Sequence, residues 1–412
     1  MVHYRDAAGA GGSLRVGETI ANHLDPDQVR AELVFTYGGP GPVTAGAQVP
    51  YHFIHASGPR DFSAWPRARA LFQQINPDVI HFQDGVVWLR IALSKTAYRK
   101  VFHVHGRYER ASAAGGFAAN PFRATALMRA YLKSTQAHVC INEGARRALI
   151  NLGWTSLGKS HVVYNAIDIT RFKPAIDKPS ARAALGLPTD LRLLGSVCRL
   201  VREKGCADLL SLIACLPANW HGVVCGDGAQ RAELEARAAH LSVSDRIHFL
   251  GSLDDVRAVY SAIDAYAFLS SYEPFGLVLA EAMTAGVPVF GVIGEGEYLE
   301  PQYPLVRPDT AVMISGDRDA HGYLRDTAIA ELAKRVEHFN DHSVDYRQMI
   351  ERARLWVQQC FAAPVQAEAM TRVYKSVCGR PTNESLADWY ENKRDFAERL
   401  LIDEREVKAA IA

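Results

Sequence analysis

Short apolar runs alternate with amphipathic stretches along most of the chain. The runs have the length and residue types of buried strands, and the stretches between them repeat their apolar residues at helical spacing. Strands are expected at 32–36, 51–54, 78–82, 101–105, 138–141, 161–163, 191–197, 222–225, 247–250, 265–269 and 287–291, and helices at 14–24, 64–75, 125–134, 143–152, 207–216, 230–241, 256–262 and 276–285. This alternation predicts an α/β protein with parallel sheets, right-handed crossovers and both sheet faces covered.

The domain boundary is expected near residues 172–180, where Lys173-Pro174 and Lys178-Pro179 interrupt the alternation. A length of 412 residues fits about two domains. We therefore predict a Rossmann-like domain at 1–175 and a second at 176–360. Residues 361–412 read as helices (365–377 and 385–408), and one option is that they cross back to the first domain. Ligands of such sheets bind outside the carboxyl ends of the strands, so two facing halves would enclose an interdomain cleft.

Composition excludes several classes of protein. The chain is 48% apolar and 22% charged with a net charge of +1, which gives no reason to expect nucleic acid as a partner. No apolar run reaches the 18 or more residues of a membrane span, and the N-terminus lacks a signal-peptide core. The seven cysteines show no C-x-x-C spacing, so buried thiols in a reducing cytoplasm are expected rather than disulfides or zinc.

Charge is distributed unevenly along the chain. Residues 60–133 contain 12 Lys or Arg against four acidic residues. A solvated basic face would explain this excess. The alternative is a surface that attracts an anionic acceptor or makes peripheral contact with an acidic membrane leaflet.

Two segments of the first half are candidates for ligand contacts. Gly11 and Gly12 belong to a glycine-rich turn before the first long helix, where backbone N–H groups can approach an anion or the glycines can simply form a tight turn. His103 and His105 share one side of a strand, and His105 at its carboxyl end is well placed for a cleft. A structural histidine held by backbone hydrogen bonds is the alternative, and two histidines without a third ligand are poor evidence for zinc.

Two loops of the second half carry further candidates. Arg199 and Lys204 bracket the loop after its first strand, where two cations can converge on one diphosphate, or form a solvated loop with Glu203 as partner. The Gly226-Asp227-Gly228 segment indicates a tight turn.

Glu273 and Glu281 flank a predicted loop-to-helix junction, with Pro274 expected at the first helical position. Glu281 should lie on the second or third turn of this helix, whose free N–H groups could bind an anion. The two acids could instead be a helix-terminal charge and an exposed helical acid, or the carboxylate pair of a glycoside hydrolase. The loops suited to phosphate argue against hydrolysis, because a simple glycoside has no diphosphate.

The segment from Glu273 to Glu281, together with the glycine, histidine and Arg/Lys loops, resembles glycosyltransferase family 4, whose members are retaining, nucleotide-sugar-dependent enzymes of the GT-B fold. The main match is the E-x7-E signature, here Glu273-Pro274-Phe275-Gly276-Leu277 through Glu281. Further pieces follow in family order: Gly11-Gly12-Ser13, His105-Gly106, Asn165-Ala166-Ile167-Asp168 with Phe172-Lys173-Pro174, Arg199-Leu200 with Glu203-Lys204-Gly205, and Phe249-Leu250-Gly251. The resemblance covers about residues 1–375.

The resemblance implies a role for each matching residue. Arg199 and Lys204 would bind the donor diphosphate, with help from backbone N–H groups of Gly11, Gly12 and the segment Phe275-Gly276-Leu277. Glu281 would accept hydrogen bonds from the ribose hydroxyls, while Glu273 and His105 would contact the donor sugar. The implied catalytic set is thus His105, Glu273, Arg199 and Lys204, with no metal and no cofactor. Two positions depart from the family pattern, since Cys198 and Ala166 replace glycines, and the segment 291–298 lacks the usual Gly-Gly pair.

We therefore expect a retaining, metal-independent glycosyltransferase of the cytoplasm that moves a sugar from a nucleoside-diphosphate sugar to a sugar, lipid-linked or other glycan acceptor. The expected setting is bacterial polysaccharide or glycoconjugate biosynthesis. A GT-B-fold sugar-nucleotide epimerase, a phosphorylase and a non-catalytic nucleotide-sugar-binding protein are the alternatives.

Overall fold

The computed structural model describes residues 2–6, 12–58, 61–83, 89, 93, 96–106, 134–174, 176–271, 273, 275–293, 305–339, 344–382, 384–386 and 388–393. These residues form two compact units. Unit 1 contains the described residues up to 167 together with 361–393, and unit 2 contains those from 168 to 360. The sequence-based boundary at 175/176 lies eight residues further along the chain.

Local contacts explain where unit 2 begins. Asp168 caps the short helix α7 (Ile169–Phe172) by accepting hydrogen bonds from the backbone N–H groups of Thr170 and Arg171. The ring of Phe172 then packs edge-on against Tyr260 of unit 2. Pro179, at which the sequence pattern predicts a break, lies in the first turn of helix α8 (Lys178–Ala184), a position where proline is tolerated.

Unit 1 contains a seven-stranded parallel sheet with the order β3-β2-β1-β4-β5-β6-β7. Its strands are β1 (Val2–Asp6), β2 (Leu33–Tyr37), β3 (Tyr51–Phe53), β4 (Val79–Phe82), β5 (Arg99–Val104), β6 (Ala137–Cys140) and β7 (Ser160–Val162). The strands predicted for this half are confirmed to within two residues at each end.

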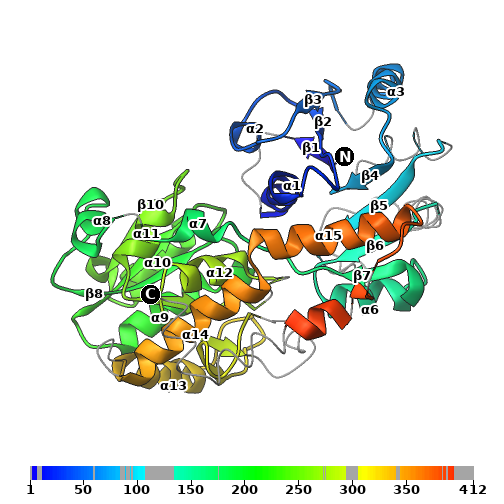
Figure 1. Cartoon of the computed structure of the whole chain (residues 1–412). Coiled ribbons are helices and arrows are strands. Elements are labelled where there is room, and N and C mark those ends of the chain that lie inside the picture. The colour runs from blue at the N-terminus through cyan, green and yellow to red at the C-terminus, as the bar shows by residue number, and fades with distance from the viewer. Residues whose placement is uncertain are drawn as a thin grey trace. The chain divides into compact units, whose positions relative to one another are not determined.

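The helices of unit 1 are α1 (Gly12–His23), α2 (Pro42–Ala45), α3 (Ala64–Ile75), α6 (Glu143–Asn151) and α15 (Ala363–Val377), with a 3₁₀ turn at Leu157–Lys159. Buried residues of α3 and α6 form one hydrophobic core with Ile80, Phe82, Phe102 and Val104. Because side chains alternate along a strand, the residues between these face the other side of the sheet. There α15 contacts α1 and lies along β5 and β6 (Figure 1).

Unit 2 contains a six-stranded parallel sheet with the order β10-β9-β8-β11-β12-β13. Its strands are β8 (Arg192–Val197), β9 (Trp220–Cys225), β10 (Ile247–Gly251), β11 (Ala265–Phe268), β12 (Val289–Ile293) and β13 (Val312–Ser315). Besides α7 and α8, its helices include α9 (Cys206–Cys215), α10 (Arg231–His240), α11 (Arg257–Ala262), α12 (Leu277–Thr284), α13 (Asp326–Glu337) and α14 (Val344–Cys360), with 3₁₀ turns at Arg202–Lys204 and Ser244–Arg246.

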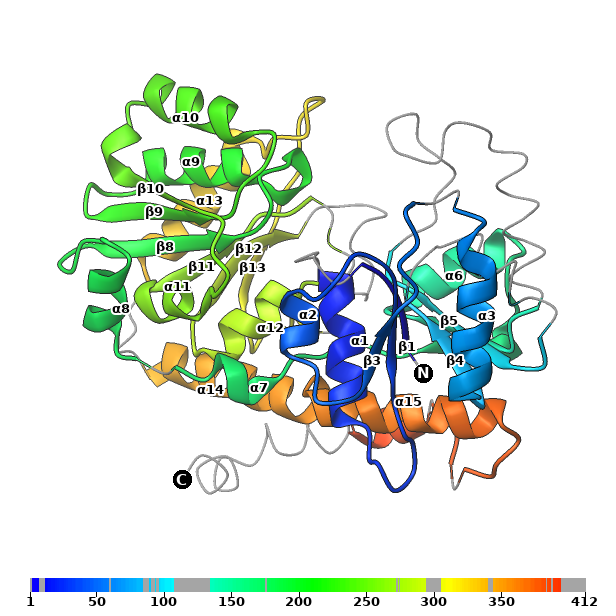
Figure 2. The same ribbon diagram turned by 90° about the horizontal axis from the view of Figure 1, so that it is seen from above.

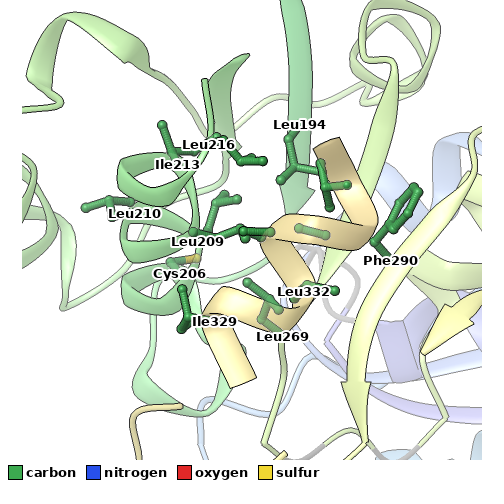
Figure 3. Packing of buried hydrophobic residues seen from close by; sticks show 14 of the residues in the cluster. Leu194, Cys206, Leu209, Leu210, Ile213, Leu216, Leu269, Phe290, Ile329 and Leu332 are labelled. Carbon is green, nitrogen blue, oxygen red and sulfur yellow. The ribbon is translucent and has the colours of Figure 1, made fainter. Parts of the chain in front are cut away.

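Helices cover both faces of this second sheet. Figure 2 shows α9 and α10 on one side of the strands and α11 on the other. Leucine and isoleucine side chains of α9 and α13 meet the strand residues Leu194 and Phe290 in one apolar core (Figure 3). The predicted α/β class with two Rossmann-like halves is therefore confirmed. In each sheet the strand order changes direction beside the first strand, between β1 and β4 in unit 1 and between β8 and β11 in unit 2. Ligands of such folds bind at this switch point.

Candidate active site

The switch point of unit 2 lies between β8 and β11. These neighbouring strands lead to loops that run in opposite directions from the same edge of the sheet. The first loop includes Arg199 and Lys204, and the second leads to Glu273. Hydrogen bonds join the loops. The backbone N–H of Ser271 donates to the carbonyl of Glu203 at 2.8 Å, the Ser271 hydroxyl donates to the same carbonyl at 3.4 Å, and the Lys204 ammonium donates to Glu273.

The Lys204–Glu273 ion pair is largely shielded from solvent, with 16% and 13% of the two side chains exposed. It joins two residues that lie 69 positions apart in the sequence. Partial burial reduces the screening of their mutual attraction by water and salt. The structure therefore brings together two of the predicted site residues and fixes one against the other.

Gly205, which follows Lys204, shows why this loop needs glycine. Its backbone is left-handed, with φ +71° and ψ 22°, and a Cβ atom there would lie 2.2 Å from the carbonyl oxygen of Leu269. A side chain is therefore excluded both by conformation and by the closeness of the second loop.

The Gly226-Asp227-Gly228 turn supports the first loop from the β9 side. Cβ atoms at Gly226 and Gly228 would lie 1.9 Å and 2.5 Å from the carbonyl oxygens of Cys198 and Leu200. The backbone N–H of Leu200 also donates to the carbonyl of Asp227 at 2.9 Å. These glycines thus allow the turn to pack directly against the backbone on both sides of Arg199, whose side chain is exposed.

Two thiols are in contact where this loop leaves β8 and enters α9. The Sγ atoms of Cys198 and Cys206 lie 3.3 Å apart, and Cys206 is buried at the start of α9. Cys198, which stands where the family has glycine, is thus accommodated by packing its side chain on α9.

Glu281 is half-buried on the second turn of α12, as predicted, and it has a partner that the sequence did not suggest. The hydroxyl of Tyr260 donates to its Oε2 atom at 2.7 Å, and Tyr260 is buried against Tyr266. Burial raises the pKa of Glu281 above its ordinary value, while the Tyr260 hydrogen bond and the nearby Arg171 act in the opposite direction.

The start of α12 differs from the prediction. The helix begins at Leu277, three residues after Pro274, which itself lies outside the described residues. Gly276 precedes it with φ +86°, and Phe275 is buried. The left-handed glycine, not a proline at the first helical position, sets the direction of the chain into the helix.

A buried ion pair that sequence reasoning missed supports both loops. Asp208 of α9 accepts from Arg318 at 2.7 Å and from the backbone N–H of Leu324 at 3.0 Å. Arg318 also donates to the carbonyl of Leu269, the residue that contacts Gly205. Burial raises the pKa of Asp208, and the Arg318 charge acts against that rise. Because Asp208 and Arg318 lie 110 residues apart, local patterns gave no signal for this pair.

The remaining predicted residues belong to unit 1. His105 directly follows β5 and is half-buried, and burial lowers the pKa of its imidazole to about 4, so the ring is neutral at physiological pH. Gly12 is the first residue of α1, whereas Gly11 lies outside the described residues. Residues 125–133 of the predicted helix 125–134, residues 294–298 of the donor-sugar segment 291–298, and the tail beyond 393 also lie outside them.

Within the described residues, no cluster of three or more His, Cys, Asp or Glu side chains has a metal-binding arrangement. The described helices include none with the length and apolar character needed to cross a membrane.

Comparison with known families identifies both halves of the chain. Residues 10–171 match the family "Glycosyltransferase Family 4", and residues 177–300 match "Glycosyl transferases group 1". The chain is 32% identical over 195 residues to the lipopolysaccharide core biosynthesis glycosyltransferase LpsE of Rhizobium meliloti, covering 47% of this chain and 54% of LpsE. It is 37% identical over 137 residues to the lipopolysaccharide core biosynthesis mannosyltransferase LpsB of the same organism, covering 31% of this chain and 39% of LpsB. These matches thus span about half, or less, of the relatives' length.

Solved structures share the fold. Anabaena HepE in complex with UDP-glucose superimposes with a TM-score of 0.69 at 20% identity, covering 91% of this chain and 99% of HepE. WaaG, a glycosyltransferase involved in lipopolysaccharide biosynthesis, gives a TM-score of 0.63 at 16% identity, covering 92% of this chain and 100% of WaaG. With two family models matched in sequence order and this fold in both halves, the chain is a glycosyltransferase family 4-like protein of the GT-B fold.

Proposed function

We propose that the protein is a retaining glycosyltransferase that moves a sugar from a nucleoside-diphosphate sugar to a hydroxyl group of a glycan or lipid-linked acceptor. Its setting would be the cytoplasmic assembly of a bacterial lipopolysaccharide or related glycoconjugate, as the names of its relatives suggest. The observation behind this proposal is the pair of joined loops at the switch point of unit 2, where Lys204 and Glu273 meet.

The cations of these loops suit a diphosphate. The Lys204 ammonium has three N–H donors, so it can bind Glu273 and two phosphate oxygens at once. The exposed guanidinium of Arg199 adds a planar fork that matches phosphate oxygens. When the bond between sugar and phosphate breaks, negative charge grows on the departing diphosphate, and cations already held in place stabilise that charge.

The two carboxylates suit the rest of the donor. Glu281, oriented by Tyr260, would accept hydrogen bonds from the ribose hydroxyls, and Glu273 would bind the donor sugar. Backbone N–H groups of Phe275, Gly276 and Leu277, where α12 begins, would assist at the phosphates. We assign donor binding to unit 2 and acceptor binding to unit 1. Unit 1 would also provide Gly11 and Gly12 for the donor diphosphate and His105 for the donor sugar.

The proposed reaction uses neither a metal nor a cofactor, because Lys204 and Arg199 provide the positive charge that a metal ion would otherwise supply. Activity should therefore survive treatment with excess EDTA. Loss of activity that Mg²⁺ or Mn²⁺ restores would contradict this part of the proposal.

A binding experiment with a matched pair of variants tests the proposal. UDP is the first ligand to try, because HepE was crystallised with UDP-glucose. We expect UDP or another nucleoside diphosphate to raise the melting temperature and to bind in calorimetry. Lys204→Met should weaken that binding about tenfold to hundredfold, as expected for the loss of a charge-assisted hydrogen bond.

Arg202→Met is the control, since it removes a positive charge from the same loop, but from a guanidinium that lies 4.9 Å from the ring centre of Tyr323. An equal loss of nucleoside-diphosphate affinity in Lys204→Met and Arg202→Met would contradict the proposed function. So would the absence of binding of any nucleoside diphosphate to the unmodified protein. Donor consumed without acceptor would favour the epimerase. NMR of the product tests retention of the anomeric configuration.

A further inference from the structure

The carboxyl edge of the unit 1 sheet holds a hydrogen-bonded pair from neighbouring strands. Gln83 directly follows β4 and His105 directly follows β5, and these strands are paired in parallel with Phe82 opposite Phe102. Nε2 of His105 lies 2.8 Å from Oε1 of Gln83, and Gln83 is only 4% exposed. A contact this well shielded fixes the imidazole more firmly than a solvent-exposed one.

The pair continues into a longer chain of polar groups on the α15 side of the sheet. The amide nitrogen of Gln83 lies 3.3 Å from Nε2 of His81, and Nδ1 of His81 lies 2.8 Å from the hydroxyl of Tyr374 on α15. Burial lowers the pKa of both His81 and His105. Each ring is therefore neutral and carries one N–H group.

The ring of His103 fills the space between the other two histidines. It stacks on His81 with ring centres 5.2 Å apart and on His105 at 4.3 Å, with interplanar angles of 8° and 14°. Neither of its nitrogens has a hydrogen-bond partner among the described residues. His103 thus holds the plane of the His105 ring by packing, and the hydrogen bond to Gln83 decides which nitrogen carries the proton.

Two proton arrangements satisfy this chain, and they leave His105 in different tautomers. In one, Nε2–H of His105 donates to Gln83, the Gln83 amide donates to His81, and Nδ1–H of His81 donates to Tyr374. In the other, the Gln83 amide is reversed, and His105 carries its proton on Nδ1. That nitrogen is buried without a partner among the described residues. The second arrangement therefore buries an unpaired N–H group, which native structures avoid more strictly than an unpaired acceptor.

We propose that Gln83 is a positioning residue for His105: it accepts the Nε2–H hydrogen bond and so keeps Nδ1 without a proton. Because Nδ1 is buried in this structure, donor binding must uncover it before a hydroxyl group of the donor sugar can donate to it. His81 and Tyr374 fix the orientation of the Gln83 amide from the other end. The proposal rests on the proposed function, because that function places His105 at the donor sugar.

The first test observes the tautomer directly. In protein labelled with ¹⁵N-histidine, two-bond ¹H–¹⁵N correlation spectra distinguish the two neutral tautomers. The signals of His105 are those that disappear in His105→Gln. We expect the Nε2–H tautomer in the unmodified protein, and the Nδ1–H tautomer would overturn the proposal.

The second test separates positioning from stability. Gln83→Met removes both amide groups, and we expect kcat to fall about tenfold, the upper range for one neutral hydrogen bond. Affinity for the nucleoside diphosphate alone should remain unchanged, since that ligand lacks the transferred sugar that His105 would contact. Gln366→Met on α15 is the matched control: its amide is equally buried, its oxygen and nitrogen have no partner among the described residues, and kcat should not change.

If Gln83→Met does not fold, Tyr374→Phe replaces it, because the ring packing on His81 is kept while the hydroxyl is lost. In that variant we expect a mixture of His105 tautomers. We also expect kcat to be about twofold to threefold lower, which corresponds to part of the net free energy of one hydrogen bond. A kcat equal to that of Gln366→Met in either variant would overturn the positioning role. Absence of nucleoside-diphosphate binding in the unmodified protein would instead contradict the proposed function.

Discussion

Replacing Gly205 by alanine should separate the geometry of the two loops from ordinary backbone strain. Gly186→Ala is the matched control, because its φ of +64° is close to the +71° of Gly205 and no atom of the described residues lies within 4 Å of the added Cβ atom. Both variants force alanine into the left-handed region, at a cost of about 1–2 kcal/mol. Gly205→Ala also places Cβ at 2.2 Å from the Leu269 carbonyl oxygen, where ordinary contacts begin at 3.4 Å. The carbonyl must therefore retreat by about 1 Å, and overpacking of this kind costs a further ~1–3 kcal/mol.

That retreat would disturb the proposed donor site. The Leu269 carbonyl accepts from Arg318 at 2.6 Å, and Ser271, two residues later, donates to the carbonyl of Glu203. In urea unfolding, the free energy of unfolding should decrease by about 1–2 kcal/mol in Gly186→Ala and by about 2–5 kcal/mol in Gly205→Ala. In calorimetry, affinity for the nucleoside diphosphate should fall about tenfold or more in Gly205→Ala, the loss of roughly one charge-assisted hydrogen bond, and stay unchanged in Gly186→Ala. Unchanged donor affinity in a folded Gly205→Ala protein would refute the reasoning.

Three further predictions concern the groups behind the site. Tyr260→Phe keeps the buried ring but removes the hydrogen bond to Glu281, so donor affinity in calorimetry should fall about tenfold with a small change in melting temperature. Because burial raises the pKa of Glu281 above its ordinary value, donor affinity should decline as the pH falls through that raised pKa, and Glu281→Gln should abolish this dependence. In the same window the free energy of unfolding without ligand should decrease as the pH rises, since the native protein binds this proton more tightly than the unfolded chain. Asp208→Asn leaves Arg318 without its charge partner and should cost about 3 kcal/mol in urea unfolding, against less than about 1 kcal/mol for Asp255→Asn, whose carboxylate forms an exposed pair. Equal losses in these two variants would contradict a supporting role for the buried pair.

Local patterns were sufficient for most of the fold. Alternating apolar runs placed eleven strands close to their observed positions, because a buried strand and an amphipathic helix each carry their period in the sequence. The expectation contained no element between 292 and 364, where the structure has β13, α13 and α14. The signal for α13 was present, since Ala328, Ile329, Leu332, Ala333 and Val336 repeat at helical spacing and are buried. The edge strand β13 has four residues, of which Ile314 is buried, so its pattern is weak.

The contacts that hold the site depend on residues far apart in the sequence. Lys204 and Glu273 were predicted as members of one site, but their direct ion pair follows from the adjacency of β8 and β11 in the sheet. The contact between Tyr374 and His81 spans 293 residues and exists because α15 returns to unit 1. No local period carries such information, because a side chain's partner is set by tertiary packing rather than by its neighbours in the chain.

The two acids of the E-x7-E signature have partners of different kinds, and this bears on their roles. An acid/base couple of the hydrolase type needs two carboxylates that act on one bond between them. Glu273 instead pairs with the cation Lys204 across two loops, whereas Glu281 accepts from the neutral hydroxyl of Tyr260 on α11. Each carboxylate is thus oriented by a donor from a separate segment of unit 2. Groups fixed in this way are suited to accept hydrogen bonds from hydroxyls, and the cations beside them are suited to the charge that develops on a departing diphosphate. The arrangement therefore favours binding and orientation of a donor over direct proton transfer by the two acids.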